Sequence, residues 1–174
     1  LEYNRFSGLR YKSQIGLDVN YETVDGSKIE DGSASVYNYS LFTQSSFEVN
    51  EKLTTQVGLR LPYHSLYATN LIPSVHFKYD FNKHNQIRLS YSQGFRSPTI
   101  KELHMEFIDI NHNIIGNSEL KPEKSDAFQM SLALLPKHSD QIYWSVNIEG
   151  FVNLLNNKIE LARIQNTDAY TYYN

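Results

Sequence analysis

The chain has 174 residues, a formal net charge of −3 and no cysteine. This length is enough for one domain with a sizeable core. The nearly balanced charge argues against a nucleic-acid partner, which would need a basic face. Without cysteine, the chain has neither a disulfide scaffold nor a thiolate metal site.

The pattern of apolar residues excludes a helical membrane protein. No run reaches the about 18 apolar residues that a transmembrane helix needs, and the first residues, LEYNRFSGLR, lack the apolar stretch of a signal peptide. A membrane β-barrel is still compatible, because alternating strands have a modest average hydropathy. The 13 tyrosines and 9 phenylalanines could form the aromatic girdles of such a barrel.

Alternation of apolar and polar residues predicts about eight strands. From residue 9 to 22, for example, Ile15, Leu17 and Val19 share one parity, whereas Gln14 and Asp18 lie on the other. Further strands are predicted at 36–49, 53–63, 71–81, 87–95, 126–135, 142–153 and 159–164. Residues 1–6 are too few to assign.

The predicted connections alternate in length. Those at 50–52, 82–86 and 136–140 are short, and those at 24–35, 64–70 and 96–125 are long. Outer-membrane barrels have short periplasmic turns and longer extracellular loops. The alternation therefore predicts that the connection 96–125 is a long extracellular loop, and its length suggests a functional role.

Parity alone does not say which face is inside. A soluble β-barrel or β-sandwich that binds a ligand would bury the apolar face, whereas a membrane barrel turns that face to lipid. Under the membrane interpretation, the lipid-facing residues include Tyr37, Leu41, Val57, Leu59, Val75, Phe77, Tyr79, Leu89 and Tyr91. On the polar parity, we expect Asp80 to pair with Arg88 across the turn at 82–86.

Two separated blocks resemble the barrel signature of TonB-dependent outer-membrane receptors. The first runs from Gly94 to Pro98 (GFRSP) and is followed by Lys101-Glu102-Leu103, and the second runs from Gly116 to Ser125 (GNSELKPEKS). The departures are mild: Ser97 replaces the usual alanine, His104 a common tyrosine, and Ser118-Glu119 the usual Pro-Asp. Together the blocks cover about 35 residues and occur in the family's order.

The resemblance implies an all-β fold, an antiparallel up-and-down transmembrane β-barrel of about 22 strands in the bacterial outer membrane. Residues 1–174 would form about eight of these strands, a partial barrel without plug or signal peptide. Such receptors are not enzymes and carry no intrinsic cofactor. They import a scarce nutrient and contact the TonB complex through the plug. Of the nutrients that such receptors import, we expect an iron-siderophore or haem here, with cobalamin as the third candidate.

The long loop contains the candidate functional residues. Ser97 is the expected N-cap and Pro98 the first residue of a short helix whose apolar stripe is Ile100, Leu103 and Phe107. This helix either packs on the barrel rim or lines a ligand pocket. By resemblance, the ligand-binding motif comprises Phe95, Arg96, Ser97, Pro98, Asn117, Ser118, Glu119 and Leu120. The loop histidines His112 and, second, His104 are candidate ligands of haem iron.

Overall fold

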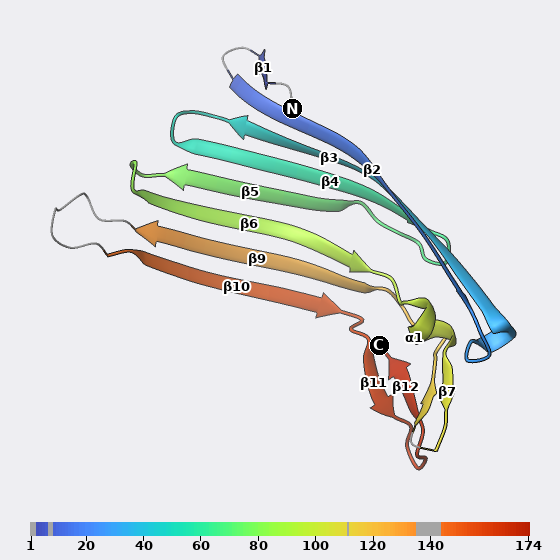
Figure 1. Cartoon of the computed structure of the whole chain (residues 1–174). Helices are drawn as coiled ribbons and strands as arrows, with labels where there is room; N and C mark the ends of the chain where they lie inside the picture. The colour runs from blue at the N-terminus through green and yellow to red at the C-terminus, as the bar shows by residue number, and fades with distance from the viewer. Residues whose placement is uncertain (1–2, 7–8, 111, 135–143) are drawn as a thin grey trace.

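A computed structural model describes residues 3–6, 9–110, 112–134 and 144–174 (Figure 1). Its main feature is an antiparallel sheet of eight strands in the order β1-β2-β3-β4-β5-β6-β9-β10. The strands are β1 (Tyr3–Phe6), β2 (Leu9–Asp25), β3 (Ser33–Glu48), β4 (Leu53–His64), β5 (Ile72–Asp80), β6 (Asn85–Arg96), β9 (Glu123–Leu134) and β10 (Val146–Asn156). Among the described residues the sheet has two open edges, at β1 and β10, and does not close.

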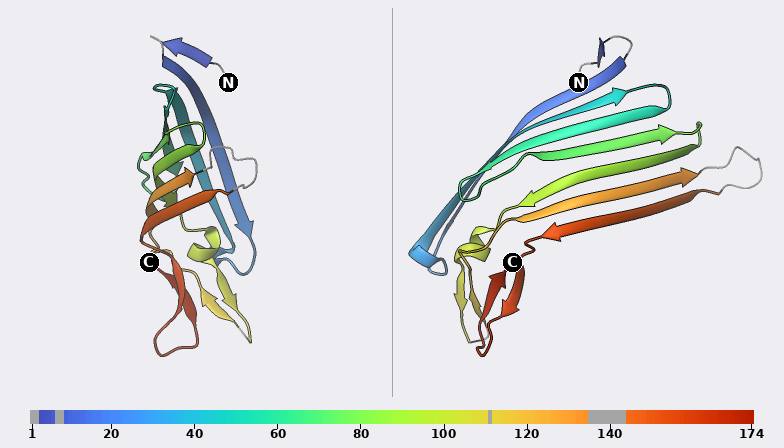
Figure 2. Two further views of the ribbon diagram at one scale, coloured as in Figure 1. Left: turned by 90° about the vertical axis from the view of Figure 1, so that its left-hand side faces the viewer. Right: turned by 180° about the vertical axis from the view of Figure 1, so that it is seen from behind.

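The remaining elements gather at one end of this sheet. They are the 3-10 helix η1 (Glu30–Gly32), helix α1 (Ile100–His104), β7 (Glu106–Ile108), β8 (Asn113–Ile115), β11 (Glu160–Arg163) and β12 (Tyr170–Tyr173). The four short strands form a second sheet in the order β11-β12-β8-β7, in which β12 and β8 are parallel. We call this end the rim, and we call α1, β7, β8, β11, β12 and residues 26–32 the rim assembly (Figure 2).

One face of the main sheet is apolar and lies open. The register places Leu17, Leu41 and Leu61 side by side on β2, β3 and β4, and these side chains are exposed. No element of the described chain packs on this face as the second layer of a sandwich would. The soluble sandwich is therefore the wrong alternative, because its apolar side chains would be buried between two sheets.

Two groups of aromatic residues border the apolar face. Near the rim, Tyr21, Tyr37, Tyr39 and Tyr63 stack in succession. Near the opposite end Tyr11 stacks on Phe47, and Tyr79 meets Phe81 edge to face. Eight residues separate Tyr39 from Phe47 on β3, which is about 27 Å along the strand. At a strand tilt of about 40° this becomes about 20 Å, close to the apolar band of an outer-membrane barrel.

The opposite face is mostly polar, and one of the aromatic side chains on it explains a glycine. Phe42 points to the polar face and lies directly over Gly16 of the neighbouring strand, so that any Cβ at Gly16 would collide with the ring. The guanidinium of Arg60 lies over the same ring, 5.8 Å from its centroid, and donates to Asp18 at 3.1 Å. Glycine thus lets an aromatic side chain lie flat on a strand.

The buried hydrophobic side chains in the described part of the chain lie at or near the rim. They are Ile29, Val36, Ile100, Leu103, Leu120 and Ala169. The small hydrophobic core of this chain is therefore the rim assembly, and the large sheet exposes both of its faces. None of the helices in the described ranges is long and apolar enough to cross a membrane.

Most predicted strands are present, and the differences have local causes. The strand predicted at 159–164 belongs to the rim sheet as β11, and β1 completes the main sheet in its place. The predicted turn at 136–140 lies outside the described residues. The predicted Asp80–Arg88 pair is wrong: Asp80 lies opposite Gln86 and bonds Lys78 at 2.8 Å, whereas Arg88 lies opposite Lys78.

The register differs because the turn is tighter than predicted. The side-chain Oδ1 of Asn82 accepts hydrogen bonds from the backbone N–H groups of His84 and Asn85, and Phe81 N–H donates to Asn85 O at 2.9 Å. These bonds start β6 two residues earlier than the apolar pattern suggested. Asn50 accepts the equivalent bonds in the turn between β3 and β4.

Candidate functional site

The first signature block ends β6 and starts α1. Phe95 and Arg96 are the last residues of β6, and Pro98 is buried at the start of the connection. The N-cap is Thr99, not the predicted Ser97: the Thr99 hydroxyl accepts from Glu102 N–H at 3.2 Å, and Glu102 accepts from Thr99 N–H at 2.7 Å. This reciprocal capping box satisfies two helix-end donors, so it outcompetes a serine followed by proline.

Arg96 links helix α1 to the main sheet. Its guanidinium donates to Glu102 of α1 at 3.0 Å and to Glu123, the first residue of β9, at 2.7 Å. The two carboxylate side chains are only 16% and 18% exposed. Because these ions are largely withdrawn from water, loss of one partner would cost more than loss of a surface pair.

The ionisation of Glu102 follows from this arrangement. Burial opposes the charged form, but hydrogen bonds from Arg96 and from the backbone and hydroxyl of Thr99 outweigh it and lower the pKa of Glu102 below its ordinary value. Glu102 therefore stays ionised at neutral pH and keeps both the cap and the ion pair.

The second signature block packs against α1. An ideal Cβ built on Gly116 would lie 2.6 Å from the backbone oxygen of Leu103, so only glycine fits. Gly116 N–H donates to Met105 O at 2.7 Å, and Asn117 N–H donates to Glu102 O at 2.9 Å. Gly116 and Asn117 therefore have a structural role: they let this segment lie directly against the backbone of α1.

The other residues of the second block divide between the core and solvent. Leu120 is 3% exposed and belongs to the rim core. Ser118 and Glu119 are exposed, and Glu119 N–H donates to the side-chain oxygen of Asn117 at 2.9 Å. The motif residues thus lie in one assembly, but several of them hold that assembly together instead of facing outward.

The C-terminal segment completes the rim assembly, which the sequence did not reveal. Asn117 donates to Tyr172 O at 2.8 Å, and β12 pairs in parallel with β8. Asn174 exchanges hydrogen bonds with the backbone of Lys121, at 2.5 and 3.0 Å, and Ile159 N–H donates to Glu123 at 2.7 Å. Two connections far apart in sequence therefore form one body (Figure 1).

The hairpin of β2 and β3 reaches the same body. Ile29 forms a β-bridge with Met105, and Glu106 N–H donates to Lys28 O at 2.8 Å. The ammonium of Lys28 lies over the ring of Phe107, 3.9 Å from its centroid. In sequence these residues belong to a turn-rich loop, so nothing there indicated a contact with the signature blocks.

The two candidate histidines lie at opposite ends of the β7–β8 hairpin. His104 ends α1 at the base, and its Nδ1 is 3.7 Å from a carboxylate oxygen of Glu30. It lines a small cavity of about 180 Å³ together with Asn117 and Ser118. His112 is near the tip, so the structure does not bring the two imidazoles together.

His112 has a defined orientation. Its Nδ1 is 3.0 Å from a carboxylate oxygen of Asp109, its backbone N–H donates to the same residue at 2.7 Å, and its ring is tilted against Phe107 at 4.9 Å. A carboxylate on Nδ1 fixes the tautomer and leaves Nε2 for a ligand. In the described part of the chain, no three histidine or acidic side chains are grouped to hold a metal ion.

Among the residues that sequence reasoning missed, Glu123 and Asn174 are central to the rim. The Glu102 cap was recognisable, since Thr99 and Glu102 have the spacing of a capping box. Glu123 lies within the second signature block, but its ion pair with Arg96 depends on strand order, and the role of Asn174 depends on the C-terminal segment, for which the sequence carried no signal.

Comparison with known proteins identifies the fold. The family model described as "TonB dependent receptor-like, beta-barrel" matches residues 1–174. The chain belongs to this family of outer-membrane β-barrels, whose members are transport receptors and not enzymes. The main sheet is accordingly part of an antiparallel barrel, with its apolar face toward lipid and its polar face toward the interior.

Solved structures show the same fold. The siderophore receptor PirA from Pseudomonas aeruginosa is 16% identical with a TM-score of 0.76, and the match covers 97% of this chain and 31% of that one. A mutant of the ferric enterobactin receptor PfeA from the same organism, in complex with enterobactin, gives 16% and 0.76, with coverage of 98% and 30%. The haemophore receptor HasR of Serratia marcescens, solved with its haemophore HasA and heme, gives 14% and 0.75, with coverage of 96% and 34%.

This chain thus spans about a third of the length of the solved receptors that it matches. No curated protein sequence matches it.

Proposed function

We propose that the chain is part of the barrel of an outer-membrane receptor that imports an iron chelate, a siderophore complex or haem. In this proposal the rim assembly is extracellular, and uptake is driven by the TonB complex through a plug domain. The observation that carries it is the position of the rim assembly, which extends beyond one end of a sheet with a lipid-compatible face. The turns at the other end that the structure describes, 49–52 and 81–84, are short, as periplasmic turns are.

The aromatic residues support this placement. The row from Tyr21 to Tyr63 lies near the rim, and a second aromatic group borders the opposite end of the apolar face. Tyrosine and phenylalanine girdles mark the two membrane interfaces of such barrels. The rim sheet then lies in water beyond the outer interface, where a nutrient complex can reach it.

The choice of an iron chelate rests on the structural neighbours and on the chemistry of the rim. PirA is described as a siderophore receptor, PfeA as a ferric enterobactin receptor, and HasR was solved with heme. The three share this fold at low identity, so they support the class of ligand and leave its identity to experiment. Growth of a receptor-deletion strain on single iron sources, with and without the restored receptor, tests the proposal.

Haem is the second candidate, and the geometry of His112 favours it. A neutral imidazole is a common axial ligand of haem iron. With its Nδ1 beside Asp109, His112 can present Nε2 to iron, and Phe107 and the fully exposed Ile110 supply apolar surface near the tip. His104 faces Glu30 at the base of the hairpin and is the second choice.

A titration of the full-length receptor with haemin tests this assignment. We expect a shift of the Soret band in the parent that is weakened in His112→Ala and less affected in His104→Ala. His84→Ala, in a short turn at the opposite end of the sheet, is the matched control. No Soret shift in the parent, or unchanged affinity in the double variant of His104 and His112, refutes haem ligation and leaves the siderophore proposal standing.

A further inference from the structure

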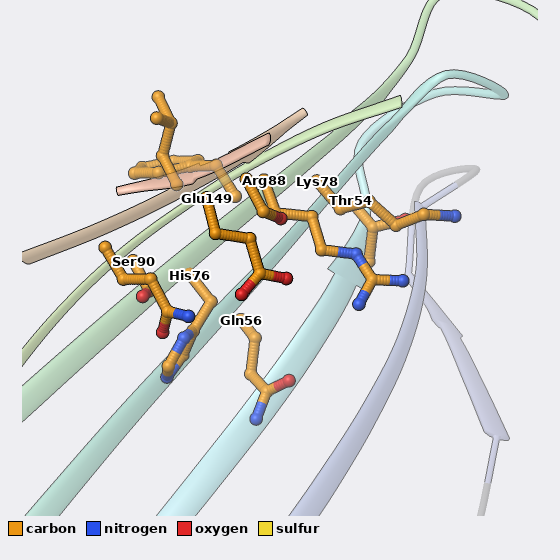
Figure 3. A pocket seen from close by; sticks show the side chains of 11 residues that line it. Thr54, Gln56, His76, Lys78, Arg88, Ser90 and Glu149 are labelled. Carbon is orange, nitrogen blue, oxygen red and sulfur yellow. The ribbon is translucent and has the colours of Figure 1, made fainter. Parts of the chain in front are cut away.

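His64 is the one buried titratable side chain in the described part of the chain. It ends β4 on the polar face, lies beyond Tyr63 on the rim side and is only 4% exposed. His76, on the same face of the neighbouring strand, has a more ordinary position. It is half-buried and lines an open hollow of about 420 Å³ among polar side chains (Figure 3). The burial of His64 is explained by the segment that follows it.

The connection between β4 and β5, residues 65–71, contacts His64 in two ways. Nδ1 of His64 accepts a hydrogen bond from Leu66 N–H at 3.2 Å, and the Tyr67 ring is tilted against the imidazole, with 5.2 Å between the ring centroids. A ring nitrogen that accepts an N–H carries no proton, so the imidazole is neutral and its proton is on Nε2. This conformation of the connection therefore requires a neutral His64.

Two further hydrogen bonds hold the connection without a titrating group. Ser65 N–H donates to Tyr37 O on β3 at 3.0 Å, and the Thr69 hydroxyl donates to Pro62 O on β4. Neither bond changes near neutral pH, because backbone and hydroxyl groups do not titrate there. The bond to His64 is the anchor of this connection that depends on pH.

The groups around His64 act on its charge in opposite directions. Burial disfavours the imidazolium more strongly than the carboxylate of Glu22 on β2 favours it, so the pKa of His64 lies below its ordinary value of 6.5. Asn38, directly opposite on β3, is uncharged. Burial and the charge of Glu102 both raise the pKa of Tyr67, so its phenol is neutral at these pH values. The influence of Glu102 also places the connection close to α1.

We propose that residues 65–71 form a pH-operated flap beside α1, which protonation of His64 releases from the rim. In the imidazolium, Nδ1 carries a proton that faces the N–H of Leu66, and two donors cannot bond each other. A buried cation is also unfavourable, and opening of the flap lets water reach the ring. Under the proposed function the flap is extracellular and responds to the pH outside the cell, whichever nutrient the receptor carries.

The size of the response follows from linkage between protonation and closure. Because closure lowers the pKa of His64 from 6.5, the closed flap is fully favoured above that pH and loses favour as the pH falls. The ratio of open to closed flap rises by up to about tenfold for each pH unit, and it levels off below the closed-state pKa. Glu102 does not interfere at pH 5 and above, because its pKa is lowered from 4.5.

The mobility of a spin label measures the flap in the full-length receptor. Residues 1–174 contain no cysteine, and Ala68 is an exposed position in the flap, so Ala68→Cys introduces a single thiol into this region for a nitroxide. We expect an ordered spectrum at pH 8 and a growing mobile component as the pH falls to 5, with a midpoint below 6.5. Glu22→Gln should move this midpoint to lower pH, because it removes the charge that favours the imidazolium.

Two substitutions of His64 separate its proton from its packing. His64→Asn offers an acceptor oxygen to Leu66 N–H and does not titrate, so the flap should stay ordered at both pH values. His64→Ala lacks the acceptor, and the flap should be mobile at both. A transition that persists in His64→Asn overturns the proposal, and so does an unchanged parent spectrum between pH 8 and pH 5.

Other histidines supply the controls. His76→Asn removes an imidazole from the same face of the neighbouring strand, and His104→Gln removes the one beside Glu30. Both variants should keep the transition of the parent. A transition that His104→Gln abolishes would assign the pH response to the contact between His104 and Glu30, and this result also overturns the proposal.

Failure of the flap is distinguishable from failure of the proposed function. If the flap opens with the predicted pH dependence but no iron source depends on the receptor, the flap proposal holds and the transport proposal falls. If iron uptake is demonstrated and the label at residue 68 does not respond to pH, only the flap proposal is wrong.

Discussion

Replacing Gly116 by alanine should open the rim assembly. The new Cβ would lie 2.6 Å from the backbone oxygen of Leu103, so one of the two backbones must move. Overpacking of this kind costs about 1–3 kcal/mol. The hydrogen bonds from Gly116 to Met105 and from Asn117 to Glu102 lengthen as well, at about 1 kcal/mol each. Because the φ of Gly116 is not positive, the effect is steric and not a strain of backbone conformation.

Hydrogen exchange of the receptor in detergent measures this cost. A loss of about 3–5 kcal/mol in the local opening free energy corresponds to a roughly 140- to 4,000-fold loss of protection for the β7 and β8 amides. The β4 and β5 amides should be unaffected. Gly150→Ala is the control, because its Cβ would meet nothing within 4 Å. Unchanged protection of β8 in Gly116→Ala would refute the argument that glycine is required for this close approach.

Two further predictions concern the main sheet and the cap of helix α1. Val57→Arg on the apolar face should destabilise the folded protein in a bilayer by about 2–4 kcal/mol, as measured by equilibrium refolding into vesicles. The neighbouring Gln56→Arg, on the polar face, should cost much less, and equal costs would mean that the faces are misassigned. Because folding lowers the pKa of Glu102 from 4.5, its stabilisation is complete above that pH and is lost as the pH falls through the folded-state pKa. The thermal midpoint of the parent should therefore fall more steeply below pH 4.5 than that of Glu102→Gln, and parallel curves would contradict the role of the Arg96 ion pair.

The strands of the main sheet were predictable because one physical rule, the alternation of side chains along a strand, decides which face each residue occupies. In β3 and β4, side chains of Leu41, Leu59 and Leu61 alternate with polar ones, and period two is the period of a strand. The same rule failed to give the register of β5 and β6. Alternation is satisfied by any shift of two residues, and only the hydrogen bonds of Asn82 in the turn select one.

The rim was predictable in its parts and not as a whole. The short helix and its buried Ile100 and Leu103 follow from apolar spacing, and the capping box of Thr99 and Glu102 could have corrected its start. The parallel pairing of β8 with β12 had no local signal, because short strands carry little pattern and their partner is remote in sequence. The signature residues lie together in the rim assembly, and several of them hold other loops in place; their predicted role in ligand binding stays a prediction.

The parallel pairing of β8 and β12 has a consequence for the order of folding. Between these two strands the chain forms the β9–β10 hairpin beside β6, so we expect β12 to find β8 after that hairpin has joined the sheet. Contacts between segments so remote in sequence form late, because the entropy of closing the intervening chain must be offset first. The rim sheet should therefore be the last part of this region to become protected during insertion. A protease that cuts the β7–β8 hairpin in early intermediates would lose access to it once the wall is complete.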